Sequence, residues 1–440
     1  MPTFADLGLS KTVVDTLAAN GIDSPFPIQA ATLPDSVAGR DVLGRGRTGS
    51  GKTYAFLLPV VTRLTAKPVK RAPVRPRALI LAPTRELAAQ ISASLAPLAA
   101  ATGLRSVTII GGVGPNPQIQ ALRQGVDIVI ACPGRLEDHV KSRHADLSAV
   151  EITVLDEADH MADLGFLPPV KRLLDKTPRN GQRMLFSATL DGGVDVLVKR
   201  YLNNPVVHSV DSEQSPVTAM EHHVLHVDKA ARLGVLADLA ASPGRTIVFA
   251  RTKHGAKNLA RQLNSRGVPA VELHGNLSQN ARTRNLAAFS DGSATVLVAT
   301  DIAARGIHVD DVSLVVHADP PVEHKAYLHR SGRTARAGAD GTVVTLMLDE
   351  QVSDVRQLTR KAGVKPTITR FSGSSHPVLN EIAPGKRTFG DSIVASRPEP
   401  ARPHQPSSAR GHQQRRRRPT RSRRRAATSG SNATTTPNAE

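Results

Sequence analysis

Eight residues near the N-terminus have the types and spacing needed to hold a nucleotide phosphate. Gly46-Arg47-Thr48-Gly49-Ser50-Gly51-Lys52-Thr53 follows the pattern Gly-x-x-x-x-Gly-Lys-Thr. The glycines let the backbone turn tightly and bring its N–H groups close to phosphate oxygens. The Lys52 ammonium can reach the β- and γ-phosphates, and the Thr53 hydroxyl can ligate Mg²⁺. The segment therefore predicts a nucleotide site at the start of a helix, where the helix dipole favours anions.

Carboxylates further along the chain supply the chemistry for hydrolysis. Asp156-Glu157-Ala158-Asp159 directly follows the apolar run Ile152–Leu155, which we expect to be a buried strand. A carboxylate at the end of such a strand, beside a phosphate loop, can hold Mg²⁺ directly or through water, which is the role we assign to Asp156. Glu157 can orient and deprotonate the attacking water.

The elements that must position these residues alternate between strand-like and helical segments. From residue 1 to 210, short apolar runs read as strands and are separated by helical stretches such as Arg85–Leu98 and Pro169–Leu174. This alternation predicts an α/β fold with a parallel sheet covered by helices, and ligands of such sheets bind at the carboxyl ends of the strands. The expected strands are Ala78–Leu81, Asp127–Ile130, Ile152–Leu155 and Met184–Phe186.

A second α/β series follows a polar segment at residues 211–220, which we interpret as a linker. Residues 221–365 repeat the architecture but contain no phosphate loop of their own, so we expect one nucleotide site completed by both domains. Helices are expected at Lys253–Arg266 and Gln351–Lys361. The expected strands are Thr246–Phe249, Ala270–Leu273, Thr295–Val298, Leu314–Val316 and Thr342–Leu346.

The charge of the chain is strongly positive and unevenly placed. The 440 residues carry a formal charge of +19, and residues 366–440 contain 14 Lys/Arg against 4 Asp/Glu. This balance favours a polyanionic partner, nucleic acid first. Eight arginines between Arg415 and Arg425 lie in a stretch with almost no apolar periodicity, so we expect 366–440 to be a disordered basic tail. The single cysteine, Cys132, and the lack of a long apolar run indicate a cytoplasmic protein without a membrane span.

The order and spacing of four motifs resemble the DEAD-box ATP-dependent RNA helicases of bacterial type. These motifs are the phosphate loop, Asp156–Asp159, Ser187-Ala188-Thr189 and the run His329–Arg336. The resemblance covers residues 4–363 and implies two tandem RecA-like domains with ATP and Mg²⁺ as cofactors. It also implies that Ser187 and Thr189 link the ATP site to the RNA site through hydrogen bonds.

The resemblance further implies a set of ATP contacts. Phe4 would stack on the adenine, and Gln29 would read its edge. Arg333 and Arg336 would act as arginine fingers on the γ-phosphate. His308 stands where the family usually has an aspartate that contacts the ribose, so we expect a modest loss of ATP affinity. The remaining implied ATP contacts are Arg47, Thr48, Gly49, Ser50, Gly51 and Gly306.

RNA contacts implied by the resemblance involve groups suited to phosphates and 2′-hydroxyls rather than to bases. Aromatic residues make up 3% of the chain, so base stacking is not expected, and binding should be independent of RNA sequence. The implied contacts are Pro83, Thr84, Arg85, Gly111, Gly112, Pro133, Gly134, Arg135, Gln279, Arg282, Thr300 and Asp301.

Together these observations predict an RNA-stimulated ATPase that closes its two domains to separate short duplexes or remodel RNA–protein complexes. Complexes of ribosome assembly or RNA decay would be its partners. A DNA helicase or translocase on the same paired domains is one alternative. A non-catalytic RNA-binding chaperone is the other, and the intact Lys52, Asp156, Glu157, Arg333 and Arg336 argue against it.

Overall fold

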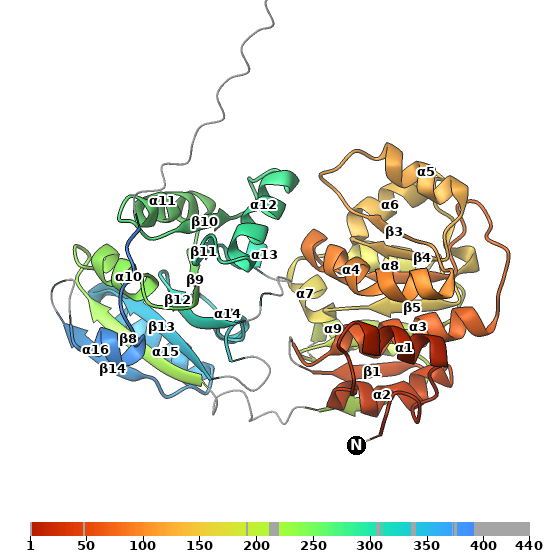
Figure 1. Cartoon of the computed structure of the whole chain (residues 1–440), viewed down its shortest axis with the longest axis horizontal. Coiled ribbons are helices and arrows are strands. Elements are labelled where there is room, and N and C mark those ends of the chain that lie inside the picture. The colour runs from red at the N-terminus through yellow and green to blue at the C-terminus, as the bar shows by residue number, and fades with distance from the viewer. Residues whose placement is uncertain are drawn as a thin grey trace, which may run out of the picture. The chain divides into compact units, whose positions relative to one another are not determined.

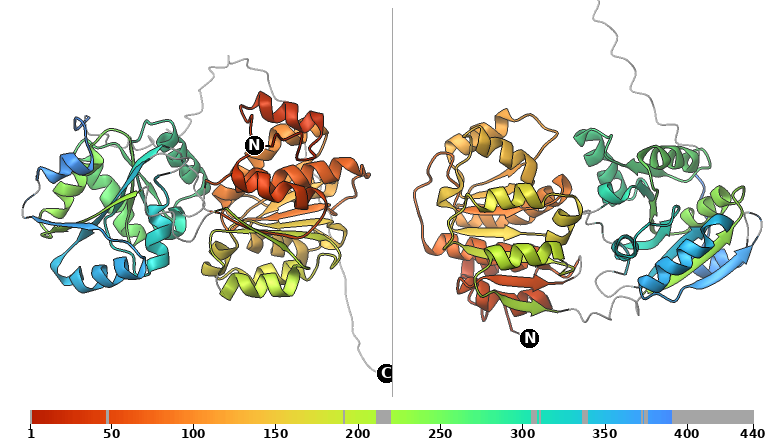
Figure 2. Two further views of the ribbon diagram at one scale, coloured as in Figure 1. Left: turned by 90° about the horizontal axis from the view of Figure 1, so that it is seen from below. Right: turned by 180° about the vertical axis from the view of Figure 1, so that it is seen from behind.

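A computed structural model describes residues 2–46, 49–190, 192–210, 220–304, 309, 311–335, 340–371, 373 and 376–390. Several predictions fall outside these residues: the ATP contacts at Arg47, Thr48, Gly306 and His308, the second finger Arg336, the linker at 211–219, and the tail after Gly390. Two seven-stranded sheets form the frame of the described chain (Figures 1 and 2). All neighbouring strands in both sheets run parallel, as predicted.

The first sheet has the strand order β3-β4-β2-β5-β6-β1-β7. Its central strands are apolar and buried along their whole length, as a sheet covered on both faces requires. The strands are β1 (Val42–Arg45), β2 (Ala78–Leu81), β3 (Ser106–Ile109), β4 (Ile128–Ala131), β5 (Ile152–Leu155), β6 (Gln182–Ser187) and β7 (Val206–Ser209).

The second sheet has the equivalent order β10-β11-β9-β12-β13-β8-β14. The repeated order confirms that the two halves of the chain share one architecture. The strands are β8 (Met220–Val227), β9 (Arg245–Phe249), β10 (Ala270–Leu273), β11 (Val296–Ala299), β12 (Val312–His317), β13 (Gly341–Met347) and β14 (Thr367–Phe371).

Helices cover both faces of each sheet (Figures 1 and 2). The first domain contains α1 (Lys11–Ala19), α2 (Pro27–Val37), α3 (Lys52–Ala66), α4 (Arg85–Thr102), α5 (Asn116–Gln124), α6 (Pro133–Lys141), α7 (Ala158–Asp163), α8 (Leu167–Leu174) and α9 (Gly192–Tyr201), with a 3₁₀ turn at Leu147–Ala149. The second contains α10 (Arg232–Ala240), α11 (Lys253–Asn264), α12 (Gln279–Ser290), α13 (Asp301–Ala304), α14 (His324–Ser331), α15 (Val352–Lys361) and α16 (Val378–Ile382), with a 3₁₀ turn at Asp349–Gln351.

Alternate residues of each strand feed separate cores on the two sides of the sheet. In β2, Ala78 and Ile80 join one hydrophobic cluster, whereas Leu79 and Leu81 join another. In β9, Val248 joins one cluster, and Ile247 and Phe249 join a second. Each sheet is therefore held from both faces, which leaves the carboxyl ends of its strands as the edge available for ligands. No helix in the described ranges is long and apolar enough to cross a membrane.

The second domain extends well past residue 365, so our placement of its end was wrong. Strand β14 (Thr367–Phe371) pairs in parallel with β8 at the edge of the sheet. Helix α16 follows and buries Leu379 and Ile382 in the domain core. The Arg387 guanidinium then donates hydrogen bonds to Asp238 Oδ1 (3.0 Å) and to Leu379 O (2.9 Å). These elements are short, and the apolar residues in this Pro- and Ser-rich stretch are too few for their periodicity to stand out.

Candidate nucleotide and RNA sites

The phosphate loop connects β1 to α3, as its sequence predicts. Gly49 and Gly51 have φ values of +88° and +89°, in the left-handed region that glycine adopts without strain. A Cβ at Gly51 would lie 2.7 Å from Gln29 Nε2 and 2.9 Å from Phe26 Cβ, so this position has no room for a side chain. The buried Lys52 begins α3 and donates a hydrogen bond to the Gly46 carbonyl across the loop.

Gln29 links the loop to the start of α2. Its side chain is fully buried, its Oε1 accepts a hydrogen bond from the Phe26 N–H (3.0 Å), and its Nε2 donates one to the Gly51 carbonyl (2.9 Å). The Gln29 amide therefore braces the phosphate loop at the Gly51 carbonyl. This role could not be predicted from the position of Gln29 in the sequence. Contact between Gln29 and adenine stays a prediction.

The predicted stacking of Phe4 on adenine is wrong for this structure. Only 2% of the Phe4 surface is exposed, and the ring lies in the hydrophobic core of the first domain. Stacking requires a free ring face, and side chains of the core already cover this ring. Phe4 therefore anchors the N-terminal segment to the domain.

Asp156 and Glu157 lie side by side at the carboxyl end of β5 with opposite titration behaviour. Burial, together with the neighbouring Glu157 charge, raises the pKa of Asp156 to about 7. Burial also acts to raise the pKa of Glu157, but a hydrogen bond with His160 and nearby positive charges outweigh it and lower that pKa to about 2. His160 Nδ1 and Glu157 Oε2 are 3.0 Å apart. Glu157 is thus held ionised at neutral pH, as a group that takes a proton from water must be.

Glu157 adopts a left-handed backbone conformation, with φ of +50° and ψ of +54°, immediately before α7. Conformations of this kind are uncommon outside glycine and concentrate at functional sites. Because the chain turns here, Asp156 and Glu157 both lie between the end of β5 and the start of α7. His160, one turn into α7, was not among the predicted site residues. Its spacing of three from Glu157 on a helix was the available signal.

A hydrogen-bond network joins the acidic motif to the Ser187–Thr189 motif. Asp159 Oδ2 accepts bonds from both the Thr189 N–H (2.9 Å) and the Thr189 hydroxyl (3.0 Å). The Ser187 hydroxyl accepts a bond from the Asp159 N–H (3.3 Å) and donates one to the Thr189 carbonyl (2.7 Å). The structure thus brings the two motifs together, and Asp159 is the shared partner.

Predicted RNA residues of the first domain lie just beyond β2, β3 and β4, whose carboxyl ends share one edge of the sheet. Thr84 caps α4 by accepting a hydrogen bond from the Leu87 N–H. The Arg85 guanidinium lies against the Gly111–Gly112 turn, where a Cβ on Gly112 would collide with it. Arg135 Nη1 donates to the Val113 carbonyl (3.1 Å). The remaining members are Pro83 after β2, and Pro133 and Gly134 at the start of α6.

In the second domain the predicted RNA residues follow β10 and β11. Gln279 begins α12, and Thr300 follows the last residue of β11. Arg282 is buried and donates to the His274 carbonyl (3.3 Å). Asp301 has a different role from the one predicted, because both of its oxygens accept hydrogen bonds from Arg330 (2.5 and 2.7 Å). A carboxylate engaged in this way, and negatively charged, is a poor phosphate contact.

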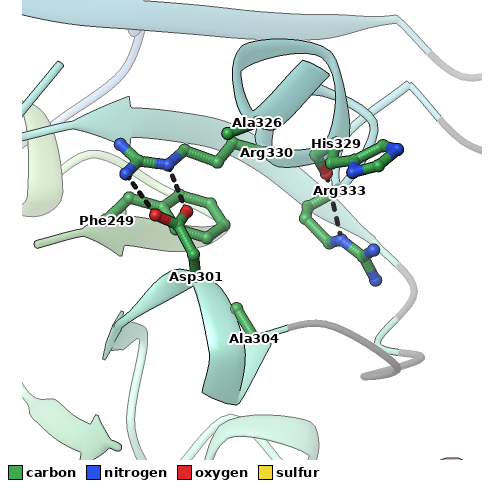
Figure 3. Close-up of a pocket in the computed structure, with 7 residues that line it drawn as sticks. All are labelled: Phe249, Asp301, Ala304, Ala326, His329, Arg330 and Arg333. Carbon is green, nitrogen blue, oxygen red and sulfur yellow. Dashed lines mark hydrogen bonds and ion pairs between the residues drawn. The ribbon is translucent and has the colours of Figure 1, made fainter. Parts of the chain in front are cut away.

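A small pocket in the second domain is bounded by the arginine-bearing helix α14 (Figure 3). The Arg330 guanidinium forms an ion pair with Asp301 and lies over the Phe249 ring, 5.1 Å from the ring centroid. Arg333 lines the same pocket and donates a hydrogen bond from Nε to the His329 carbonyl (3.3 Å). Arg330 and Phe249 were not among the predicted site residues, although Arg330 lies within the His329–Arg336 run.

A phosphate loop and an acidic strand end on one parallel sheet, with an arginine-bearing helix on a second, define a nucleoside triphosphatase with tandem α/β domains. The sequence profile of the DEAD/DEAH box helicases matches residues 26–196, and that of the helicase conserved C-terminal domain matches residues 228–338. The chain is 38% identical over 390 residues to the ATP-dependent RNA helicase RhlB of Erwinia tasmaniensis, covering 87% of this chain and 90% of that protein.

Solved structures agree with the sequence comparison. The chain resembles S. cerevisiae Dbp5 bound to RNA and ADP BeF3, with a TM-score of 0.74 and 29% identity, over 84% of this chain and 96% of that one. It also resembles the DEAD-box helicase Mss116 bound to ssRNA and UDP-BeF, with a TM-score of 0.76 and 27% identity, over 87% and 82%. The chain therefore belongs to the DEAD-box ATP-dependent RNA helicases, with two RecA-like domains. It is an RNA-dependent ATPase that unwinds RNA, as the sequence predicted.

Proposed function

We propose that ATP and RNA together close the two RecA-like domains of this helicase, and that closure completes the hydrolytic site. Glu157 orients the attacking water, and Lys52 holds the phosphates from the loop. Arg333 and Arg336 then stabilise charge that develops on the γ-phosphate. The single observation that carries this proposal is the placement of Asp156 and Glu157 at the carboxyl end of β5, on the same sheet as the phosphate loop, with Glu157 Oε2 3.0 Å from His160 Nδ1.

Mg²⁺ fits the residues around the loop. A carboxylate at Asp156 and a hydroxyl at Thr53 are hard oxygen ligands, and Mg²⁺ commonly uses one or two such groups together with phosphate oxygens and water. The Ser50 hydroxyl of the same loop is buried and has no hydrogen-bond partner among the described residues, so an incoming phosphate would satisfy it. When bound, the metal would neutralise charge on the phosphates. Asp156 and Thr53 would hold it.

RNA binding is proposed to involve the backbone and to be independent of sequence. The groups at the strand ends are hydroxyls, exposed glycine backbone and guanidinium groups, such as Thr84, Gly112 and Arg135. The RNA path would bend on domain closure, so that base pairing fails locally, and product release would reopen the cleft. Ser187 and Thr189 would pass the state of the ATP site to the RNA site through Asp159.

The experiment that tests this proposal compares ATPase stimulation by RNA and by DNA of matched sequence. We expect RNA to raise kcat strongly and DNA to have little effect. Equal stimulation by both would favour the DNA translocase alternative. A failure of RNA to stimulate hydrolysis at all would support a non-catalytic chaperone instead.

The polybasic segment Arg415–Arg425 is proposed to tether RNA. Eight arginines on single-stranded RNA would steepen the dependence of log K on log salt by up to about 5–6. Truncation after Pro400 should flatten this slope, and an unchanged slope would remove the tethering role. We also propose that the protein acts in the cytoplasm on complexes of ribosome assembly or RNA decay. Crosslinking in cells followed by sequencing of the bound RNA tests that proposal.

A further inference from the structure

Helix α11 of the second domain presents a row of positive charge to solvent. Lys253, Lys257 and Arg261 are spaced four residues apart and all three are exposed, so they share one face of the helix. A rise of 1.5 Å per residue places successive members about 6 Å apart along the axis. The helix Lys253–Asn264 contains no acidic residue. We call these three side chains the α11 stripe.

The stripe keeps its charge, unlike many cations on the first domain. There, Arg172 pairs with Glu137 (2.6 Å) and Arg200 with Asp175 (3.0 Å). Within the described ranges, no carboxylate forms an ion pair with a member of the stripe. Lys253 Nζ instead donates to Asn276 Oδ1 (3.1 Å), and Arg261 Nη2 to Asn258 Oδ1 (2.7 Å). Amide oxygens orient these cations without cancelling their charge.

The amino end of the stripe is joined to the loop that carries predicted RNA residues. Lys253 bonds Asn276, whose N–H donates to His274 Nδ1 (3.3 Å). The His274 carbonyl accepts a bond from Arg282 (3.3 Å), and Gln279 begins the helix on which Arg282 lies. The stripe therefore continues the row of RNA-facing groups at the end of β10.

The carboxyl end of α11 lies close to Gly390, the last residue that the structure describes. Gly267, three residues after the helix, accepts a hydrogen bond from the Gly390 N–H (2.7 Å). A Cβ on Gly267 would lie 2.3 Å from the Gly390 carbonyl oxygen, so the two backbones are in close contact. The segment before Gly390 is held by the Thr388 N–H, which donates to Ala241 O (2.9 Å). The stripe thus spans the surface between the β10 loop and Gly390.

We propose that the α11 stripe binds the phosphate backbone of RNA that extends beyond the strand-end site, and guides it toward the basic tail. This inference rests on the proposed RNA site of the second domain. Unpaired cations that follow a groove or helix contact polyanions without reading bases, and association releases counterions. Lysine and arginine at regular spacing fit a backbone with regularly spaced charges. The occupant is RNA, and an acidic protein partner is the competing outcome of the test.

The test replaces the stripe in the full-length chain with K253Q/K257Q/R261Q and compares it with R356Q/R360Q/K361Q. The control removes three exposed positive charges from helix α15 of the same domain, so net charge is matched. Affinity for long single-stranded RNA is measured over a range of salt concentrations. The stripe variant should lower the log K versus log salt slope by about 2, because each lost phosphate contact on a single strand contributes about 0.7. The control should change the slope far less.

A second RNA separates the stripe from the strand-end site. The probe is the shortest oligonucleotide that gives the wild-type chain its full ATPase stimulation, and it should bind the stripe variant as tightly as wild type. The proposal would be overturned if the two variants gave equal slopes on long RNA, or if the stripe variant lost the same affinity for both RNA lengths. It would also be overturned if the stripe variant lost only its binding of an acidic protein and kept its affinity for RNA. Melting temperatures check that both variants fold. An absence of RNA stimulation in wild type would refute the proposed function, whereas the slope comparison reports on the stripe alone.

Discussion

Substitution of Gln29 by glutamate tests whether this residue braces the phosphate loop. Glutamate keeps an oxygen that can accept the bond from the Phe26 N–H, but it replaces the donor that faces the Gly51 carbonyl at 2.9 Å. Two oxygens then face each other at a fully buried site. A lost hydrogen bond that leaves a buried group unsatisfied costs about 1–3 kcal/mol. If the cost falls on the nucleotide-binding form of the loop, ATP affinity drops by about 5- to 150-fold.

The assay is calorimetric titration of the RNA-free protein with ATP and, separately, with GTP. Gln29→Met serves as the matched variant, because it has similar length and makes neither hydrogen bond. If Gln29 only braces the loop, each variant weakens ATP binding and GTP binding by equal factors. If Gln29 also reads the adenine edge, ATP binding weakens more than GTP binding, and the preference between the two nucleotides shrinks. The two roles therefore give different ratios from one set of measurements.

Unchanged affinity for both nucleotides in Gln29→Glu would refute this reasoning, provided that the variant melts at the wild-type temperature. A large fall in melting temperature with unchanged affinity would show that the amide supports the domain and not the loop. Gly51 provides a second check. Gly51→Ala should disrupt nucleotide binding more severely, because the new Cβ would lie within 3 Å of both Gln29 and Phe26 at a backbone φ of +89°.

Three further predictions concern catalysis, pH and the ribose contact. Glu157→Gln should retain ATP and RNA binding while kcat falls by about 10²–10⁴, and rapid hydrolysis by this variant in single-turnover assays would contradict the role of Glu157 as base. Burial, together with the charge of His223, lowers the pKa of His222 to about 4. Between pH 6.5 and 4 the unfolded chain therefore binds a proton at this position that the folded chain does not bind. Stability should therefore fall as pH falls through this window, and His222→Gln should show a smaller loss of melting temperature between pH 7 and 5; an identical loss would refute this assignment. His308→Asp should tighten ATP binding about fivefold, the equivalent of one hydrogen bond of about 1 kcal/mol, and unchanged affinity would remove the ribose contact.

Much of the fold follows from local patterns that are short in sequence. The runs Ala78–Leu81, Ile152–Leu155 and Ala270–Leu273 became strands at the predicted residues, because continuous apolar runs of this length suit a sheet buried on both faces. Three strands at sheet edges, β3, β7 and β14, were not predicted, and neither was β8, which lies beside β14. They are partly exposed and mix polar with apolar residues, so they lack that signal, and only their pairing with a neighbour defines them.

The chemistry of the site was readable because its groups are adjacent in sequence. A phosphate loop requires glycine, lysine and threonine at fixed spacing, and the acidic strand end requires neighbouring carboxylates. Backbone geometry over a few residues decides both. The identity of the family, and with it RNA unwinding driven by ATP, followed from the order of such motifs.

Tertiary structure decided which of those side chains are free and which are already engaged. Phe4 is buried, Asp301 holds Arg330, and Gln29 braces Gly51, although their positions in the motifs indicated ligand contacts. The bond between Asp159 and Thr189 likewise depends on how β5 and β6 pair in the sheet. Burial and hydrogen-bond partners are set by segments far apart in the chain. A local pattern therefore specifies what a residue can do, and packing determines what it is available to do.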